Sequence, residues 1–135
     1  MYFDHEKLDI YRAAMEFALL IDEIVEQFPR GRSYLTDQLH RAGTSILLNI
    51  AEGAGEYAEN EKVRFYRMAR RSGTESAAIL ELGNRLGLIE ESKFVKSREL
   101  LIRIISMLTR MTRESRSGWE KKIGNGNGKT VTVTK

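Results

Sequence analysis

The chain has 135 residues, which fits a single domain, and about two-thirds of the unfolded surface of such a chain can be buried in a core. It contains no cysteine, which excludes disulfides, thiolate zinc sites and cysteine nucleophiles, and its net charge of +3 selects no class of partner by itself. No stretch approaches the roughly 18 uninterrupted apolar residues of a membrane span, and no secretory signal is evident, so we expect a cytoplasmic protein.

The first predicted helix covers residues 5–28. Its hydrophobic residues recur at steps of three and four, which is the spacing of one helix face. We expect this face to pack in the core, and it consists of Leu8, Tyr11, Met15, Ala18, Leu19, Ile21, Val25 and Phe28. Pro29 and Gly31 end the helix, because neither residue extends a helix without cost.

A second helix is predicted to start near Ser33, a suitable N-cap, and to stop at the glycines of residues 53–55. Its inner row is Leu35, Leu39, Ala42, Ile46 and Ile50.

A third helix is predicted to start near Asn60 and to end at Gly87. Gly73 and Gly83 inside it indicate close approach of a neighbouring helix, since each glycine costs up to about 1 kcal/mol of helix stability relative to alanine. The inner row is Phe65, Met68, Ala69, Ser72, Ser76, Ile79, Leu82 and Leu86.

A fourth helix follows residues 90–92 and frays near residues 115–118. Its hydrophobic face is Phe94, Val95, Leu100, Leu101, Ile104, Ile105, Leu108 and Met111. The glycine-rich stretch that follows predicts a disordered tail. Four helices joined by short loops predict an all-α, antiparallel up-down four-helix bundle over residues 1–117, with a flexible tail over residues 118–135.

Charge is sorted along the chain. Residues 5–28 carry six acidic and two basic side chains, whereas residues 61–71 carry five basic and one acidic, and residues 92–116 carry seven basic and two acidic. The basic faces could meet nucleic-acid phosphates, or charged residues could solvate outer faces or join subunits. The candidate nucleic-acid contacts are Lys62, Arg64, Arg67, Arg70, Arg71, Arg103, Arg110 and Arg113.

Polar residues border the inner rows of the second and third helices. A spacing of four residues puts Arg41, Ser45 and Asn49 on one face of the second helix. The full set of this polar seam is Arg41, Ser45, Asn49, Glu52, Ser72 and Glu75. Three interpretations remain open: a buried hydrogen-bond network or subunit contact, a ligand or RNA contact, and catalytic or metal-binding carboxylates.

Spacing speaks against the metal and phosphate-loop interpretations. A di-iron bundle needs two Glu-x-x-His pairs, and neither His5 nor His40 has a glutamate three residues earlier. Residues 124–130 resemble a phosphate loop, but Ile123 stands where the motif requires its first glycine. We therefore expect no cofactor, no metal and no enzymatic activity.

The stretch from Phe28-Pro29 through residues 35–53 resembles the signature of the 23S rRNA intervening-sequence proteins, also called four-helix-bundle proteins. The resemblance covers roughly residues 5–113 and implies a four-helix bundle, a ring-like homopentamer and no established catalytic activity. Some members are encoded inside 23S rRNA genes. A related branch, the accessory protein of diversity-generating retroelements, works with a reverse transcriptase and nucleic acid through a basic surface. Departures include Gly43, Leu47 and Leu48, and the added charge of Arg70 and Arg71.

Two functional hypotheses follow. The first is a homo-oligomeric, non-enzymatic bundle that binds RNA or another nucleic acid through the basic faces of its third and fourth helices. The second is a protein-interaction scaffold with no nucleic-acid role and no membrane contact.

Overall fold

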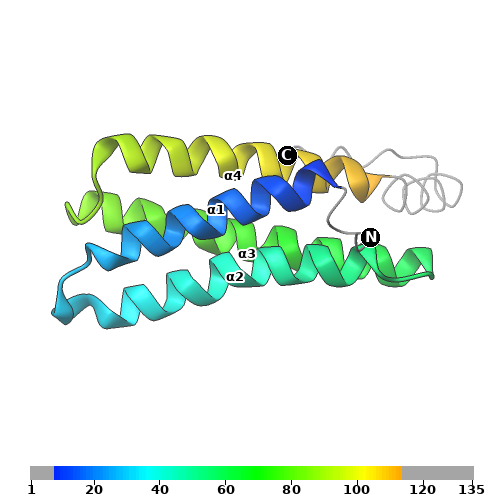
Figure 1. Cartoon of the computed structure of the whole chain (residues 1–135), viewed down its shortest axis with the longest axis horizontal. Coiled ribbons are helices and arrows are strands. Elements are labelled where there is room, and N and C mark those ends of the chain that lie inside the picture. The colour runs from blue at the N-terminus through cyan, green and yellow to red at the C-terminus, as the bar shows by residue number, and fades with distance from the viewer. Residues whose placement is uncertain (1–7, 114–135) are drawn as a thin grey trace, which may run out of the picture.

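The computed structural model describes residues 8–113, which form four helices joined by short loops (Figure 1). The helices are α1 (Asp9–Glu26), α2 (Ser33–Ala54), α3 (Glu59–Arg85) and α4 (Glu91–Met111), and a 3₁₀ turn, η2 (Arg30–Arg32), precedes α2. Within this part of the chain there is no strand, and none of the helices is long and apolar enough to cross a membrane. The predicted tail, residues 118–135, lies outside the described residues.

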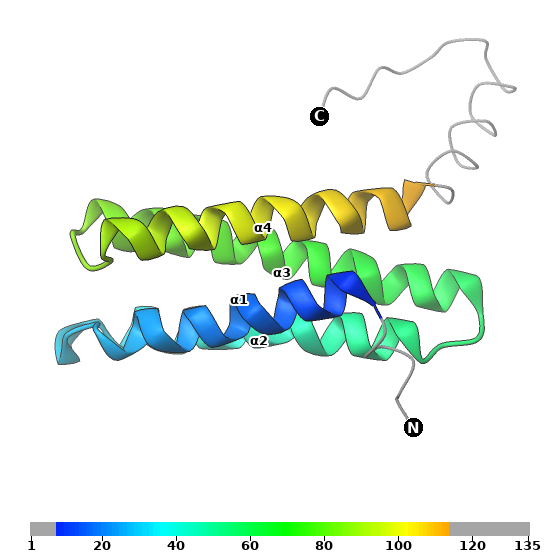
Figure 2. The same cartoon turned by 45° about the horizontal axis from the view of Figure 1, so that its top comes forward.

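Each helix packs against two neighbours, so that α1, α2, α3 and α4 follow one another around the bundle and α4 returns to α1. Consecutive helices run in opposite directions, as Figure 1 shows. In Figure 2, α1 and α2 form one layer and α3 and α4 form the other. The predicted all-α four-helix bundle is confirmed.

The core consists of one buried stripe from each helix, and every such isoleucine or leucine contributes roughly 1.5–3 kcal/mol by leaving water. The inner row predicted for α2, residues 35–50, is buried throughout. The largest fully buried hydrophobic side chains are Phe17, Ile21, Ile24, Leu39, Ile46, Ile50, Leu80, Ile104 and Leu108.

The face predicted for α1 is wrong in part: Ile21 and Val25 are buried and Leu8, Tyr11 and Phe28 pack against the core, but the centre of the buried face lies elsewhere. Leu19, expected in the core, is 61% exposed, and the buried residues are Ile10, Ala13, Ala14, Phe17, Leu20, Ile21, Ile24 and Val25. Apolar side chains occur around much of this helix, so their spacing fits two faces, and contact with α2 and α4 selects the one that carries Phe17.

The face predicted for α3 is wrong in part. Met68, Leu82 and Leu86 are exposed, and Val95 of α4 is exposed as well. The inner side of α3 is rich in small residues instead, and its buried members are Val63, Tyr66, Ala69, Gly73, Ser76, Ile79, Leu80 and Gly83.

Close helix approach at the two α3 glycines is confirmed. A Cβ atom at Gly73 would lie 3.2 Å from Ile105 Cγ1 of α4, and one at Gly83 would lie 3.0 Å from Ile89 Cδ1. Both distances are shorter than ordinary carbon–carbon contacts, so glycine lets the backbone of α3 lie close to these side chains.

Two of the predicted caps are wrong. Ser33 and Asn60 lie inside α2 and α3, whose N-cap positions make no side-chain hydrogen bond. The end of α3 is as predicted, because Gly87 has a φ of 76° and terminates the helix. There, the Leu88 N–H donates to the Gly83 carbonyl at 2.9 Å, which is the bond of a Schellman motif.

Candidate nucleic-acid interface and polar seam

The polar seam joins α2 to α3. An ion pair links Arg41 of α2 to Glu75 of α3. One turn further along, the Ser72 hydroxyl donates to Ser45 Oγ at 2.9 Å, and Asn49 Nδ2 donates to the same oxygen at 3.0 Å. Five of the six predicted members are therefore brought together by two antiparallel helices.

The seam is not buried. The side chains of Arg41 and Glu75 are 62% and 41% exposed, and Ser45, Asn49 and Ser72 are half-buried. Glu52 is exposed, and no hydrogen bond within residues 8–113 joins its carboxylate to the other five. Because water screens an exposed ion pair, Arg41 and Glu75 stabilise the isolated chain by less than about 1 kcal/mol. Within one chain the seam is therefore a partly exposed hydrogen-bond network, which leaves a subunit contact and a ligand contact open.

Beside the seam, large side chains are exposed at regular intervals. Tyr34, Arg41 and Leu48 follow one another every seven residues in α2, and Met68, Glu75 and Leu82 do so in α3. Seven residues make two helical turns, so each set lies in one row, and the ion pair of Arg41 with Glu75 sets the rows side by side. Tyr34, Leu48, Met68 and Leu82 are all exposed. We call these six residues the α2–α3 patch.

At the end of the bundle where α2 stops, α2 and α3 lie unusually close. The ring of Tyr66 packs on Gly53, where a Cβ atom would lie only 2.7 Å from Tyr66 Cε1. Lys62 Nζ donates to the carbonyls of Gly53 at 3.2 Å and Ala54 at 3.4 Å, which caps α2. Burial raises the pKa of Tyr66 above its ordinary value, and the charge of Glu59 adds to the effect.

Of the eight predicted basic residues, the five on α3 lie in the first half of that helix, residues 59–71, and Arg113 lies just past the end of α4. We call this region, which reaches from the start of α3 to its middle, the basic end. Two of these side chains are engaged locally: Lys62 caps α2, and Arg64 pairs with Glu61 at 3.0 Å. Arg70 donates to the Thr112 hydroxyl of α4 at 3.3 Å. Arg67 is exposed.

Within the basic end, Arg71 and Arg113 are available to a ligand. Both are exposed, and no hydrogen bond or ion pair within residues 8–113 engages either guanidinium.

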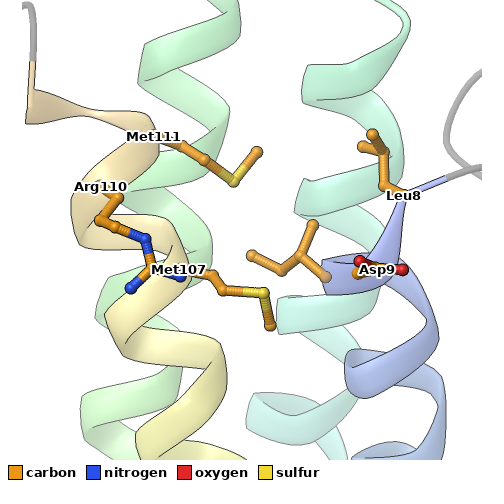
Figure 3. Close-up of a pocket in the computed structure, with 6 residues that line it drawn as sticks. Leu8, Asp9, Met107, Arg110 and Met111 are labelled. Atoms are coloured by element: carbon orange, nitrogen blue, oxygen red, sulfur yellow. The ribbon is translucent and has the colours of Figure 1, made fainter.

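The other two predicted residues lie apart from this group, on the side of α4 that faces α1. Arg110 lines an open pocket of about 310 Å³ with Met107 and Met111 of α4, Asp9 and Ile10 of α1, and Leu8 just before α1 (Figure 3). Arg103 lines a second depression, with Glu16, Lys96, Glu99 and Leu100. The sequence grouped them with the α3 arginines because spacing along a helix does not say which neighbour a side chain faces.

The two layers of the bundle differ in net charge: the layer of α1 and α2 is acidic, and the layer of α3 and α4 is basic. Residues 8–58, which include α1 and α2, carry eight acidic and four basic side chains, and residues 59–113, which include α3 and α4, carry seven acidic and twelve basic ones. Long contacts cross between the layers, from Lys93 to Glu23 at 3.9 Å and from Lys96 to Glu16 at 4.0 Å. The acidic face of α1 is therefore partly neutralised by α4 within the same chain, a pairing that the sequence analysis did not anticipate.

The arginines that stack on aromatic rings do so within the chain. The Arg64 guanidinium lies 4.7 Å from the centre of the Phe65 ring, and that of Arg98 lies 5.8 Å from the centre of the Phe94 ring. Both rings are half-buried.

Among the described residues, no group of three or more histidine, aspartate or glutamate side chains is placed to hold a metal ion. His40 lies at the surface, with Nε2 at 3.3 Å from Asp22 Oδ1 of α1.

A comparison with protein-family models matches residues 6–110 to the 23S rRNA-intervening sequence protein. The chain belongs to the 23S rRNA-intervening sequence protein family. The family assignment made from the residues alone is confirmed. No curated protein matches the chain.

One solved structure similar to this family member is a protein of unknown function from the S23 ribosomal protein family of Bacteroides thetaiotaomicron. The two share 21% sequence identity with a TM-score of 0.71, over 76% of this chain and 97% of that one. This likeness shows the fold.

The residues that carry the family resemblance divide into two sets in α2. One set is buried and explained by packing within one chain: Leu35, Leu39, Ala42, Ile46, Ile50 and Gly53. The other set faces outward, at the polar seam: Arg41, Ser45, Asn49 and Glu52. Packing in the core of one chain does not explain the second set. These residues are therefore candidates for a function at the surface.

Proposed function

We propose that this protein is a non-enzymatic, homo-oligomeric helical bundle that binds RNA or another nucleic acid through the basic end of α3 and α4. The observation that carries the proposal is the uneven charge of the two layers, with twelve basic side chains in residues 59–113 and the exposed Arg71 and Arg113 at one end. When a lysine or arginine side chain binds a phosphate of a nucleic acid, the counterion held at that phosphate is released. This release supplies most of the affinity of sequence-independent binding.

The binding test uses fluorescence anisotropy with a labelled RNA of generic sequence in low salt. The pair Arg71→Gln and Arg113→Gln weakens binding and lowers the slope of log K against log salt by about 2, since each lost phosphate contact removes about 1. A control with Arg30→Gln and Arg85→Gln removes the same charge at the opposite end and keeps wild-type binding. No binding by the wild type in low salt, or equal weakening in the control, would overturn the proposal.

The homo-oligomeric part of the proposal is supported by the α2–α3 patch. Two exposed apolar side chains on each helix flank a charge-balanced ion pair, Arg41 with Glu75, and exposed apolar side chains grouped on one face favour protein contacts. A second copy of the chain is the occupant we propose, because the patch carries one charge of each sign and can complement itself.

Sedimentation velocity tests this assembly. Leu48→Glu with Leu82→Glu places two charges in the patch and reduces the assembly to smaller species. Leu19→Glu is the control for the single variant Leu48→Glu, because Leu19 of α1 is exposed to a similar degree, 61% against 56%, and lies outside the patch. A wild-type chain that sediments as a monomer at tens of micromolar would contradict self-association.

The patch also favours an alternative: a scaffold that binds a different protein and has no nucleic-acid role. A pull-down with and without nuclease separates the two functions. Partners that survive nuclease treatment, are lost with Leu48→Glu and persist with Arg71→Gln would support the scaffold.

A further inference from the structure

Two threonine side chains lie beside the basic end, one on α3 and one on α4. Thr74 follows Arg70 by one turn of α3, and Arg70 donates to Thr112 across the seam at 3.3 Å. Thr109 precedes Thr112 by one turn of α4. The contact of Gly73 with Ile105, one turn before Thr109, places these same segments of α3 and α4 against each other. Thr74 and Thr109 therefore lie on segments of α3 and α4 that pack against each other.

Both hydroxyl protons are already committed. Thr74 Oγ1 donates to the Arg70 carbonyl at 3.3 Å, and Thr109 Oγ1 donates to the Ile105 carbonyl at 2.8 Å. A hydroxyl that donates to its own helix can offer only lone pairs to a ligand. Phosphate oxygens are acceptors as well and gain nothing from such a group. A ribose 2′-hydroxyl can donate to it, and deoxyribose has no hydroxyl at that position.

Each of these acceptors has an exposed arginine three or four residues away along the chain. Arg71 is exposed on α3, three residues before Thr74, and Arg113 is exposed just beyond the end of α4. In an A-form helix the wide, shallow minor groove presents 2′-hydroxyls between the phosphates of two strands. The hydroxyl oxygens of the two threonines can accept from the 2′-hydroxyls, and the arginine near each of them can bind a phosphate of one strand.

Stacking of unpaired bases fits this surface less well. Proteins that hold single strands offer exposed aromatic faces. The rings nearest to the arginines, Phe65 and Phe94, are half-buried beneath Arg64 and Arg98. The fully exposed Tyr57 lies in the loop before α3, where Glu56, Glu59 and Glu61 repel phosphates.

We propose that the ligand of the α3–α4 seam is double-stranded RNA, selected over double-stranded DNA by the acceptor oxygens of Thr74 and Thr109. This inference rests on the proposed nucleic-acid function and names the ligand class of the same surface.

The test measures the affinity of the full chain for three probes of one sequence: an RNA duplex, a DNA duplex and single-stranded RNA. We expect the RNA duplex to bind about threefold to tenfold tighter than the DNA duplex, the range that one or two neutral hydrogen bonds supply. Thr74→Val with Thr109→Val keeps the shape of the side chains and removes the acceptors. The RNA advantage then disappears while the affinity for DNA is unchanged, and Thr44→Val on α2 leaves both unchanged.

Equal wild-type binding to RNA and DNA duplexes, tighter binding to single-stranded RNA, or an equal loss for both duplexes in the threonine variant would overturn the inference. These results differ from failure of the proposed function itself, which would show as no binding to any of the three probes in low salt. Circular dichroism of the double variant checks that the helices remain intact.

Discussion

Replacement of two glycines of α2 by alanine is expected to change the stability of the fold in opposite directions. A Cβ atom at Gly53 would lie 2.7 Å from Tyr66 Cε1 and 3.2 Å from the Lys62 carbonyl oxygen. A Cβ atom at Gly43 would lie 3.4 Å from Ile21 Cγ1, which is an ordinary contact. Gly53→Ala therefore introduces overlap, and Gly43→Ala fills available space.

The magnitudes follow from these distances. Tyr66 is 4% exposed and is held between the helices, so the ring has little room to move away. Overpacking of this kind costs about 1–3 kcal/mol. Alanine offsets at most about 1 kcal/mol of that cost through helix propensity, and less at Gly53 because α2 ends one residue later. At Gly43 the propensity gain stands alone, so this variant gains up to about 1 kcal/mol.

Thermal and urea unfolding followed by circular dichroism measure both variants, at one fixed protein concentration because self-association shifts the midpoint. We expect Gly53→Ala to melt below the wild type and Gly43→Ala at or above it, with the two separated by about 4 °C or more. A Gly53→Ala variant as stable as the Gly43→Ala variant would refute the close approach of Tyr66 to α2.

Three further predictions concern the core, the buried tyrosine and the seam. Ile104→Ala should cost about 2–5 kcal/mol in urea unfolding because it leaves a cavity, whereas Ile102→Ala on the exposed side of α4 should change stability by less than about 0.5 kcal/mol. The raised pKa of Tyr66 means that the folded chain holds this proton more tightly than the unfolded chain. The contribution of Tyr66 to the free energy of unfolding is thus fully present at neutral pH and is lost as the pH rises through about 10. In parallel pH titrations of the urea midpoint, Tyr66→Phe should make this alkaline loss of stability shallower. A double-mutant cycle with Arg41→Met and Glu75→Gln should give a coupling below about 1 kcal/mol in the unassembled chain, and a larger value would mean that the ion pair is less hydrated than its exposure indicates.

The sequence predicted α2 well and α1 and α3 less well, for a physical reason. In α2 the apolar residues from Leu35 to Ile50 recur at steps of three and four, so spacing identifies the core row even though Tyr34 and Leu48 are exposed. In α3 the core side is made of small residues such as Ala69 and Gly73, while Met68 and Leu82 lie outside. A prediction that assigns the largest hydrophobic side chains to the core therefore selects the wrong side of such a helix.

The seam shows the same limit. A spacing of four residues correctly placed Arg41, Ser45 and Asn49 together, because helix geometry is local. Whether that face is covered depends on how far α3 wraps around α2, which is a property of packing between helices. Pairing between distant segments, such as Arg70 with Thr112, is likewise set by the register of α3 against α4.

The division of charge between the two layers has a practical consequence for handling the protein. Residues 8–113 contain fifteen acidic and sixteen basic side chains, so this part of the molecule is almost neutral and yet strongly dipolar. In low salt a particle of this kind adheres to both anion- and cation-exchange resins, because it turns the matching side toward each. On heparin we expect α3 and α4 to face the matrix and α1 to face the solvent, so that chromatographic retention depends on the orientation of the bundle as well as on its net charge.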